Sequence, residues 1–203
     1  MFRSLVLSAA LILSLAACST VRQTEPDHTA TEQLLFSTAA DRAAAKLSLT
    51  VPEGAKVFVD AGATDGSAQA KYLVSAIRDE ILRKGGLLVD DKKQADMAVE
   101  PRIGAMSVDH DKTLYGIPDY GIPIPLAGSL KTPEVALYKR DTQQGVIKLA
   151  VTTYNPKTGA LIQSVAPVYG FAHTTERAVL FFFYWTRNDL IPEDEGKSWV
   201  NHD

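Results

Sequence analysis

Residues 67–86 read SAQAKYLVSAIRDEILRKGG, and this segment decides the fold that the sequence predicts. Its apolar side chains recur at three- and four-residue intervals, which is the spacing of one helix face. Gly85 and Gly86 then end the helix. The residues that we expect to face inward are Leu73, Ala76, Ile77 and Ile81.

Short segments rich in β-forming residues lie on both sides of this helix. Residues 55–61 (AKVFVDA) predict a strand before it, and residues 87–91 (LLVDD) predict a short buried strand after it. Residues 95–109 (ADMAVEPRIGAMSVD) predict a further strand that bends at Pro101. The order strand, helix, strand, strand indicates a helix packed against a sheet.

A second helix is predicted over residues 29–49 (TATEQLLFSTAADRAAAKLSL). Thr29 and Glu32 have the spacing of a capping box, and an alanine-rich sequence with high helix propensity follows them. The apolar stripe that we expect to pack inward consists of Phe36, Ala40, Ala43, Ala44 and Leu47.

The C-terminal half of the chain predicts a β-hairpin. Residues 146–154 and 160–170 are strand-like, and the NPKTG between them has turn chemistry. Residues 178–185 (AVLFFFYW) predict a last strand or a buried element. We therefore expect an α/β (α+β) fold, with a single domain over residues 31–190. It would have a mixed sheet, two main helices packed on it and this C-terminal hairpin.

The N-terminus has the three parts of a secretory signal. MFR supplies a positive charge, residues 4–15 are apolar, and Ala16 and Ala17 precede Cys18, the single cysteine of the chain. This apolar stretch is shorter than the roughly 20 residues that a membrane-spanning helix needs. We therefore expect residues 1–17 to be a signal peptide.

The sequence Leu15-Ala16-Ala17-Cys18 resembles the lipobox of bacterial lipoproteins. In that family the cysteine thiol receives diacylglycerol, the leader is cleaved before the cysteine, and the new amino group is acylated. The resemblance implies that Cys18 is a lipid anchor, because two or three acyl chains hold a protein stably on a membrane. The alternative is a small apolar cysteine that is discarded with an ordinary leader.

By the sorting rule of enterobacterial lipoproteins, Ser19 after the cysteine implies the outer membrane, with the domain facing the periplasm. Residues 18–30 are then the lipidated cysteine and a flexible tether, and residues 191–203 are a polar tail.

Residues 112–134 combine prolines and glycines with apolar side chains and predict a long loop. A loop of this length in a compact domain is usually functional or disordered. If exposed, it would be a contact for a partner or a membrane. Alternatively, it folds over the sheet and covers residues 181–185. The residues that we expect to contact a partner are Tyr115, Ile117, Tyr120, Ile122, Ile124 and Leu126.

The sequence offers little reactive chemistry. A net charge of −3 and no basic stripe argue against nucleic-acid binding. Asp109 and Asp111 would share one strand face while His110 points away, and a solvated strand end is the simpler interpretation than a cation site. No GxSxG or HExxH motif occurs. We therefore expect no catalytic residue, no cofactor and no metal.

Residues 59–67 (VDAGATDGS) precede the helix of residues 67–86, at a position where α/β sheets often bind ligands. Asp60 and Asp65 would repel an anion there. We therefore expect a turn in which Asp65 or Ser67 is the N-cap of the helix.

Three stretches resemble an uncharacterised family of bacterial lipoproteins of unknown function: TATEQLLFSTAADRAAAKL, GIPIPLAGSLKTPEVALYKR and YNPKTGALI. The likeness runs from about residue 20 to residue 190 and implies no functional residues. More remotely, LVSAIRDEILRKGGLLVDD with ADMAVEPRI is similar in organisation to the curli secretion lipoprotein and the amino-terminal domain of the translocation protein TolB. That likeness implies a scaffold for protein contacts.

Together these observations predict a membrane-anchored periplasmic lipoprotein, which acts as a non-catalytic envelope scaffold or partner-binding module for another envelope protein. The alternative is a carrier or sensor of a small apolar ligand, in which the loop is a lid and Phe181, Phe183 and Trp185 line a pocket. An enzyme would need carboxylates that converge in a cleft, and the candidates are Asp60, Asp65 and Asp109.

Overall fold

The computed structural model describes residues 28–124, 128–180 and 182–190. The predicted signal peptide, residues 18–27 of the tether and the polar tail lie outside the described residues, as do Leu126 and Phe181. The elements are α2 (Ala30–Ala45), β1 (Lys56–Val59), α3 (Ala68–Arg83), β2 (Leu87–Leu88), the short 3-10 helix η1 (Lys92–Gln94), β3 (Met97–Ile117), β4 (Gly121–Ile124), β5 (Gly128–Lys131), β6 (Val135–Tyr154), β7 (Leu161–Val179) and β8 (Phe183–Asn188).

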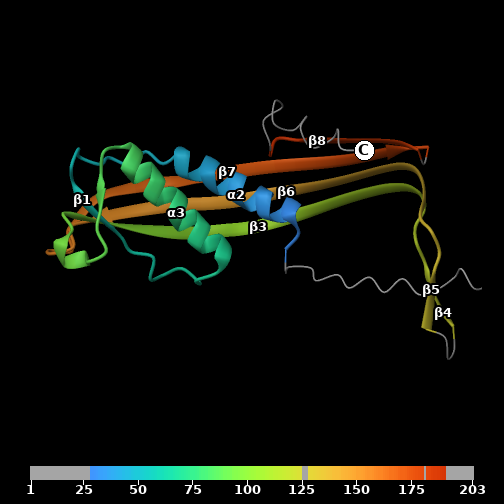
Figure 1. Cartoon of the computed structure of the whole chain (residues 1–203), viewed down its shortest axis with the longest axis horizontal. Helices are drawn as coiled ribbons and strands as arrows, with labels where there is room; N and C mark the ends of the chain where they lie inside the picture. Colours follow the sequence, from blue (N-terminus) through green and yellow to red (C-terminus); the bar gives the residue numbers. More distant parts are fainter. Residues whose placement is uncertain (1–27, 125–127, 181, 191–203) are drawn as a thin grey trace, which may run out of the picture.

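Six strands form one mixed sheet in the order β2-β1-β3-β6-β7-β8. β1 is parallel to β2 and β3, and the remaining neighbours are antiparallel. Both helices pack on one face of this sheet, at one end of the long strands (Figure 1). β6 and β7 form the predicted hairpin around the NPKTG turn. The predicted fold, a single α+β domain with a mixed sheet and two helices, is confirmed.

Local sequence signals position the start of each helix. The Thr29 hydroxyl accepts a hydrogen bond from the Glu32 N–H (3.2 Å), and the Glu32 carboxylate accepts one from the Thr29 N–H (2.8 Å). This confirms the capping box of α2. In α3 the Ser67 hydroxyl accepts from the Ala70 N–H, and the Asp65 carboxylate accepts from the Ser67 N–H in the preceding turn. Residues 59–67 are therefore the turn and cap that the sequence predicts.

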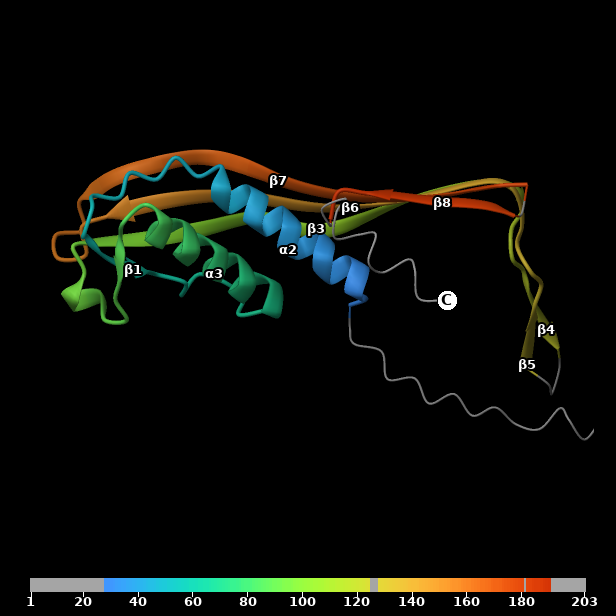
Figure 2. The ribbon, with the colours of Figure 1, turned by 45° about the horizontal axis from the view of Figure 1, so that its top comes forward.

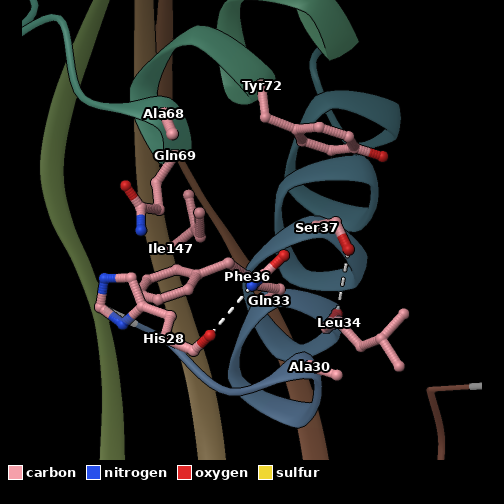
Figure 3. Close-up of a pocket in the computed structure, with 10 residues that line it drawn as sticks. All are labelled: His28, Ala30, Gln33, Leu34, Phe36, Ser37, Ala68, Gln69, Tyr72 and Ile147. Atoms are coloured by element: carbon pink, nitrogen blue, oxygen red, sulfur yellow. Dashed lines mark hydrogen bonds between the residues drawn. The ribbon is translucent and has the colours of Figure 1, made fainter. Parts of the chain in front are cut away.

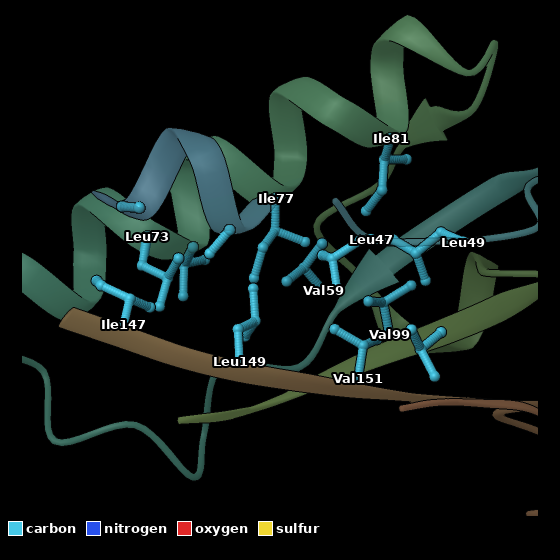
Figure 4. Close-up of a cluster of buried hydrophobic side chains, with 14 of the residues drawn as sticks. Leu47, Leu49, Val59, Leu73, Ile77, Ile81, Val99, Ile147, Leu149 and Val151 are labelled. Carbon is cyan, nitrogen blue, oxygen red and sulfur yellow. The ribbon is translucent and has the colours of Figure 1, made fainter. Parts of the chain in front are cut away.

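The core lies between the two helices and the sheet (Figure 4). Ile147, Leu149 and Val151, at alternate positions of β6, point towards the helices and are buried. Three of the four predicted inward residues of α3 are fully buried against them: Leu73, Ile77 and Ile81.

α2 lies close to the sheet because small residues meet where it crosses. A Cβ atom on Gly145 of β6 would lie 2.6 Å from the carbonyl oxygen of Leu35. A Cβ atom on Gly170 of β7 would clash with the carbonyl oxygen of Ala39. The helix contributes a buried stripe of four alanines, three of which the sequence predicts: Ala39, Ala40, Ala43 and Ala44.

Two strand predictions were wrong in detail. The segment predicted as a buried strand over residues 87–91 is the two-residue edge strand β2, which pairs only with β1, and Leu87 is 52% exposed. β3 does not bend at Pro101, which is buried and pairs in regular register with Val151. The irregularities of β3 against β6 are two register shifts, one at Gly104 and one between Tyr115 and Gly116.

The long loop predicted over residues 112–134 was also wrong. β3 continues to Ile117, β6 begins at Val135, and β4 pairs with β5 in a small hairpin at the far end of the sheet (Figure 1). This segment therefore does not fold over the sheet. Residues 178–185 are divided between β7 and β8, and β8 is exposed along its length, so they do not form a buried element.

The long strands continue far past the helices (Figure 2). β3 has 21 residues and is about 70 Å long at 3.3 Å per residue. α2 has 16 residues and is about 24 Å long. We call the part formed by residues 111–117, 135–142, 175–179 and β8 the sheet extension.

Candidate functional site

One face of the sheet has no helix on it within the described part of the chain. Since Ile147 and Leu149 point towards the helices, even-numbered residues of β6 such as Lys148 point to the opposite side. Tyr169 is the register partner of Lys148, and Phe171 is the partner of Val146, so both belong to that side. Their rings stack at 6.2 Å, and both side chains are exposed. We call this side the helix-free face.

Three of the six predicted contact residues are exposed apolar side chains at the far end of β3 and just beyond it. Tyr115 is 66% exposed, Ile117 is 58% exposed and Tyr120 is 57% exposed. Tyr115 is the register partner of Tyr138, with ring centroids 6.0 Å apart, so it lies on the helix-free face. The far end of the sheet therefore presents apolar surface to solvent.

The other predicted contact residues belong to the small hairpin beyond the sheet. The backbone pairs Ile122 with Leu130 and Ile124 with Gly128. The Tyr120 N–H donates to the hydroxyl of Thr132 (2.9 Å), which joins the base of this hairpin. Leu126 lies outside the described residues.

β8 adds exposed aromatic side chains from the segment predicted to be a last strand or a buried element. Phe183, Tyr184 and Trp185 are all exposed, and Tyr184 is the most exposed of them at 71%. Trp185 is the register partner of Arg177, and Tyr184 is the partner of Ala178. The polar residues 186–188, which complete the strand, were the available signal that this segment lies at the surface.

Ion pairs on the helix side stabilise the extension. The Glu134 carboxylate lies 3.2 Å from Lys112 Nζ and 2.9 Å from Lys139 Nζ. The hydrogen bond from Lys139, followed by that from Lys112, holds the pKa of Glu134 below its usual value.

A second polar cluster ties α2 to the end of β8. Arg42 Nη1 donates to the Asp189 carboxylate (2.7 Å) and to the Phe171 carbonyl (2.7 Å). Burial raises the pKa of Asp189, but the His173 N–H and the Arg42 guanidinium outweigh it and lower this pKa overall. These contacts fix β7 and β8 relative to the helix.

An apolar groove of about 710 Å³ lies between the N-terminal halves of α2 and α3 (Figure 3). Ile147 lies at its base, and Leu34, Phe36 and Tyr72 are among the side chains around it. The Tyr72 hydroxyl donates to Asp41 (3.1 Å), and burial, followed by this carboxylate, raises the pKa of Tyr72. The predicted pocket beneath a loop is not formed, because Phe183 and Trp185 are exposed on β8.

The three carboxylates considered for catalysis do not converge. The Asp60 carboxylate lies 3.0 Å from both Lys92 Nζ and the Tyr154 hydroxyl. Asp65 caps a turn of the same loop. Asp60 follows Val59, whose register partner on β3 is Val99. Asp109 lies ten residues farther along β3 than Val99, so it is about 33 Å away from that position.

Asp60, directly after β1, instead contacts Lys92 and Tyr154, the last residue of β6. Asp60→Asn should therefore lower the free energy of unfolding by about 1 kcal/mol at neutral pH. The hydrogen bond from Lys92, aided by that from Tyr154, holds the pKa of Asp60 below its ordinary 3.8. The stabilisation is therefore complete above pH 3.8 and is lost as the pH falls through the lower folded-state value. Urea unfolding of both proteins across this range should show their difference shrinking in acid. A difference that grows in acid would contradict this role.

Within the described ranges, no three His, Cys, Asp or Glu side chains are grouped so that they could hold a metal ion. Asp109 pairs with Gln144 and Asp111 with Thr142 along the antiparallel β3–β6 pair. None of the helices in that part of the chain is long and apolar enough to cross a membrane.

No curated protein matches the chain. Residues 12–179 match a family described as "Family of unknown function (DUF6655)", and this match covers most of the chain, including both helices and the sheet through β7. The chain belongs to this family.

Proposed function

We propose that this chain is a lipid-anchored envelope protein that binds another envelope protein through the far end of its sheet. Cys18 would hold it in the outer membrane, with the folded domain in the periplasm and without catalytic activity of its own. The observation that carries the proposal is the exposed apolar surface of Tyr115, Ile117 and Tyr120, at the end of the strands farthest from the helices.

The physical case rests on where this surface lies. Scattered exposed apolar residues are ordinary, but a contiguous group of them marks an interaction site. Tyrosine is also enriched at protein interfaces. Because these side chains lie beyond the helices, they contribute little to the core. Their apolar surface would be removed from water only by a bound partner.

The strand edges of the extension support the same function. β1 pairs with β3 only through Met97–Val99, so the outer edge of β3 has no strand partner farther along within the described residues. β8 is the opposite edge of the sheet. Open edges of this kind accept an added strand from a partner chain.

Photocrosslinking in intact cells tests the proposed contact. A photoreactive residue replaces Tyr120 in one variant and Leu82, an apolar residue of α3 with similar exposure, in the other. We expect one abundant protein adduct from position 120 that is absent from position 82. Failure to form an adduct at position 120, or the same adducts at both positions, would refute the proposed contact.

The anchor gives a separate prediction. Cys18→Ser removes the only thiol that an acyl donor could modify, so the variant should leave the membrane fraction. Mass spectrometry of the N-terminal peptide should show a diacylglyceryl group and an acylated amino group on Cys18 in the wild-type chain. Ser19→Ala keeps the thiol and should stay membrane-bound. An unmodified Cys18, or a membrane-bound Cys18→Ser variant, would rule out the anchor.

The groove between α2 and α3 favours a second candidate function, the binding of a small apolar ligand. Its volume lies in the range of small-molecule sites. If it is such a site, a fluorescent alkyl probe should bind the wild-type chain and Leu82→Glu, and Leu34→Glu at the groove should abolish the binding. No binding to the wild-type chain would eliminate this candidate.

A further inference from the structure

Three arginines gather on the helix-free face of the sheet extension. Arg140 of β6 and Arg177 of β7 are register partners, so they lie directly opposite each other. Arg187 of β8 is the register partner of Thr175, two residues from Arg177 and on the same side. Arg140 is an even-numbered residue of β6, which places all three on the helix-free face.

This arrangement is unfavourable for the chain alone. Like charges directly opposite each other destabilise an antiparallel pair. Within the described residues, none of the three makes an ion pair, and the polar contact of Arg140 is a hydrogen bond from Nε to the Thr142 hydroxyl (3.2 Å). On the other side of the extension, Lys112 and Lys139 both form an ion pair with Glu134.

The cluster is a local feature in an acidic chain whose net charge is −3. Asp109 and Asp111 share its face but lie on β3, and Asp111 is separated from Arg187 in its row by Thr142 of β6 and Thr175 of β7. Towards β8 the face is basic, and an anionic partner there would remove the repulsion between Arg140 and Arg177.

Aromatic side chains surround these arginines. Trp185 is the register partner of Arg177, and Tyr115, Tyr138 and Phe183 form the next row on the same face. Tryptophan and tyrosine concentrate where a membrane meets water, because their rings are apolar with one polar atom. Arginine beside these rings suits a surface of lipid phosphates over acyl chains.

The position of the N-terminus allows the same face to approach a membrane. The Glu32 carboxylate, near the start of α2, lies 3.6 Å from Nε2 of His110 in β3. Arg42, near the end of α2, donates a hydrogen bond to the Phe171 carbonyl of β7. The helix therefore crosses the sheet from the open β3 edge inward. Nine residues separate His28 from Cys18, so a chain from Cys18 to His28 can extend about 35 Å.

We propose that the helix-free face of the sheet extension lies on an anionic membrane surface. Arg140, Arg177 and Arg187 bind lipid phosphates, and Trp185 sits at the level of the headgroups. This contact goes beyond the proposed binding of a protein partner. It leaves Tyr115 and Ile117 at the end of β3, together with Tyr120, to contact that partner.

Fluorescence of Trp185 reports this contact in the full chain. The chain, with Trp199→Phe in every sample, is reconstituted into vesicles with brominated acyl chains, which quench a tryptophan at the membrane. One set of vesicles contains phosphatidylcholine and phosphatidylglycerol, and the other contains phosphatidylcholine alone. We expect strong quenching in the anionic vesicles, weak quenching in the neutral ones, and loss of the difference in high salt.

Charge-matched variants make the test specific. Arg140→Gln, Arg177→Gln and Arg187→Gln together should shift the equilibrium away from the docked state by on the order of a hundredfold, since each basic residue near an anionic surface contributes about tenfold or less. Lys71→Gln, Arg78→Gln and Lys93→Gln remove three charges elsewhere and should leave quenching unchanged. Equal quenching in both triple variants, or in both kinds of vesicle, would overturn the proposal. Sedimentation with the vesicles shows separately whether the chain is anchored.

Discussion

Gly170→Ala is expected to lower the free energy of unfolding by about 3 kcal/mol. The added methyl group would meet the carbonyl oxygen of Ala39, which belongs to the helix backbone and cannot rotate away. α2 would have to move off the sheet, which would open the contact between its alanine stripe and β7. Urea denaturation followed by circular dichroism measures the effect.

The matched control is the same substitution where a methyl group meets nothing. A Cβ atom on Gly121 of β4 has no neighbour within 4 Å, so Gly121→Ala should change stability by less than about 0.5 kcal/mol. Equal stability of Gly170→Ala and wild type would mean that α2 does not pack backbone-to-backbone on the sheet.

Leu149→Ala is the second large effect, with an expected loss of about 3 kcal/mol. Leu149 of β6 is fully buried beneath the helices, and its loss leaves a cavity that the surrounding side chains cannot fill (Figure 4). The same urea titration measures the change.

Leu137, on the same strand, is 54% exposed in the sheet extension. Leu137→Ala should therefore cost less than about 0.5 kcal/mol in the purified chain. If the two substitutions lowered the free energy of unfolding by similar amounts, Leu137 would have to be covered in the free protein. That result would contradict its exposure in the structure.

The helices could be predicted from sequence because their signals are local. The capping box of Thr29 and Glu32, the cap at Ser67 and the apolar spacing of Leu73, Ile77 and Ile81 each lie within a few turns of chain. The β6–β7 hairpin was similarly marked by its Asn-Pro and Gly residues.

The strands were harder to predict, because the effect of a proline depends on which edge of the strand its nitrogen faces, and the sequence does not show this. The Val99 carbonyl accepts a hydrogen bond from the Asp60 N–H on the β1 side of β3. Pro101 lies two residues farther along, so its nitrogen faces the same side, at a level where β1 has already ended. A missing N–H costs nothing there, and β3 continues straight. In the β4–β5 pair, Pro123 lies opposite Ser129 in a two-stranded ribbon.

The surface of the extension was only partly predictable. Tyr115, Ile117 and Tyr120 are exposed, and their contact with a partner stays a prediction. Whether Phe183 and Trp185 are buried stayed open, because hydrophobicity does not reveal whether another element covers a strand, and both are exposed. The pairing of Arg140 with Arg177 depends on the register of β6 and β7, since the two residues are 37 positions apart.

Whether the far end of the sheet is covered in the cell is the central question. Hydroxyl-radical footprinting of Tyr120, performed on the purified chain and again in intact cells, tests it most directly. Leu82 of α3, exposed to a similar extent, is the internal reference. We expect Tyr120 to be oxidised readily in the purified chain and to be protected several-fold in cells, with Leu82 oxidised equally in both. Equal oxidation of Tyr120 in both settings would contradict the proposed contact surface.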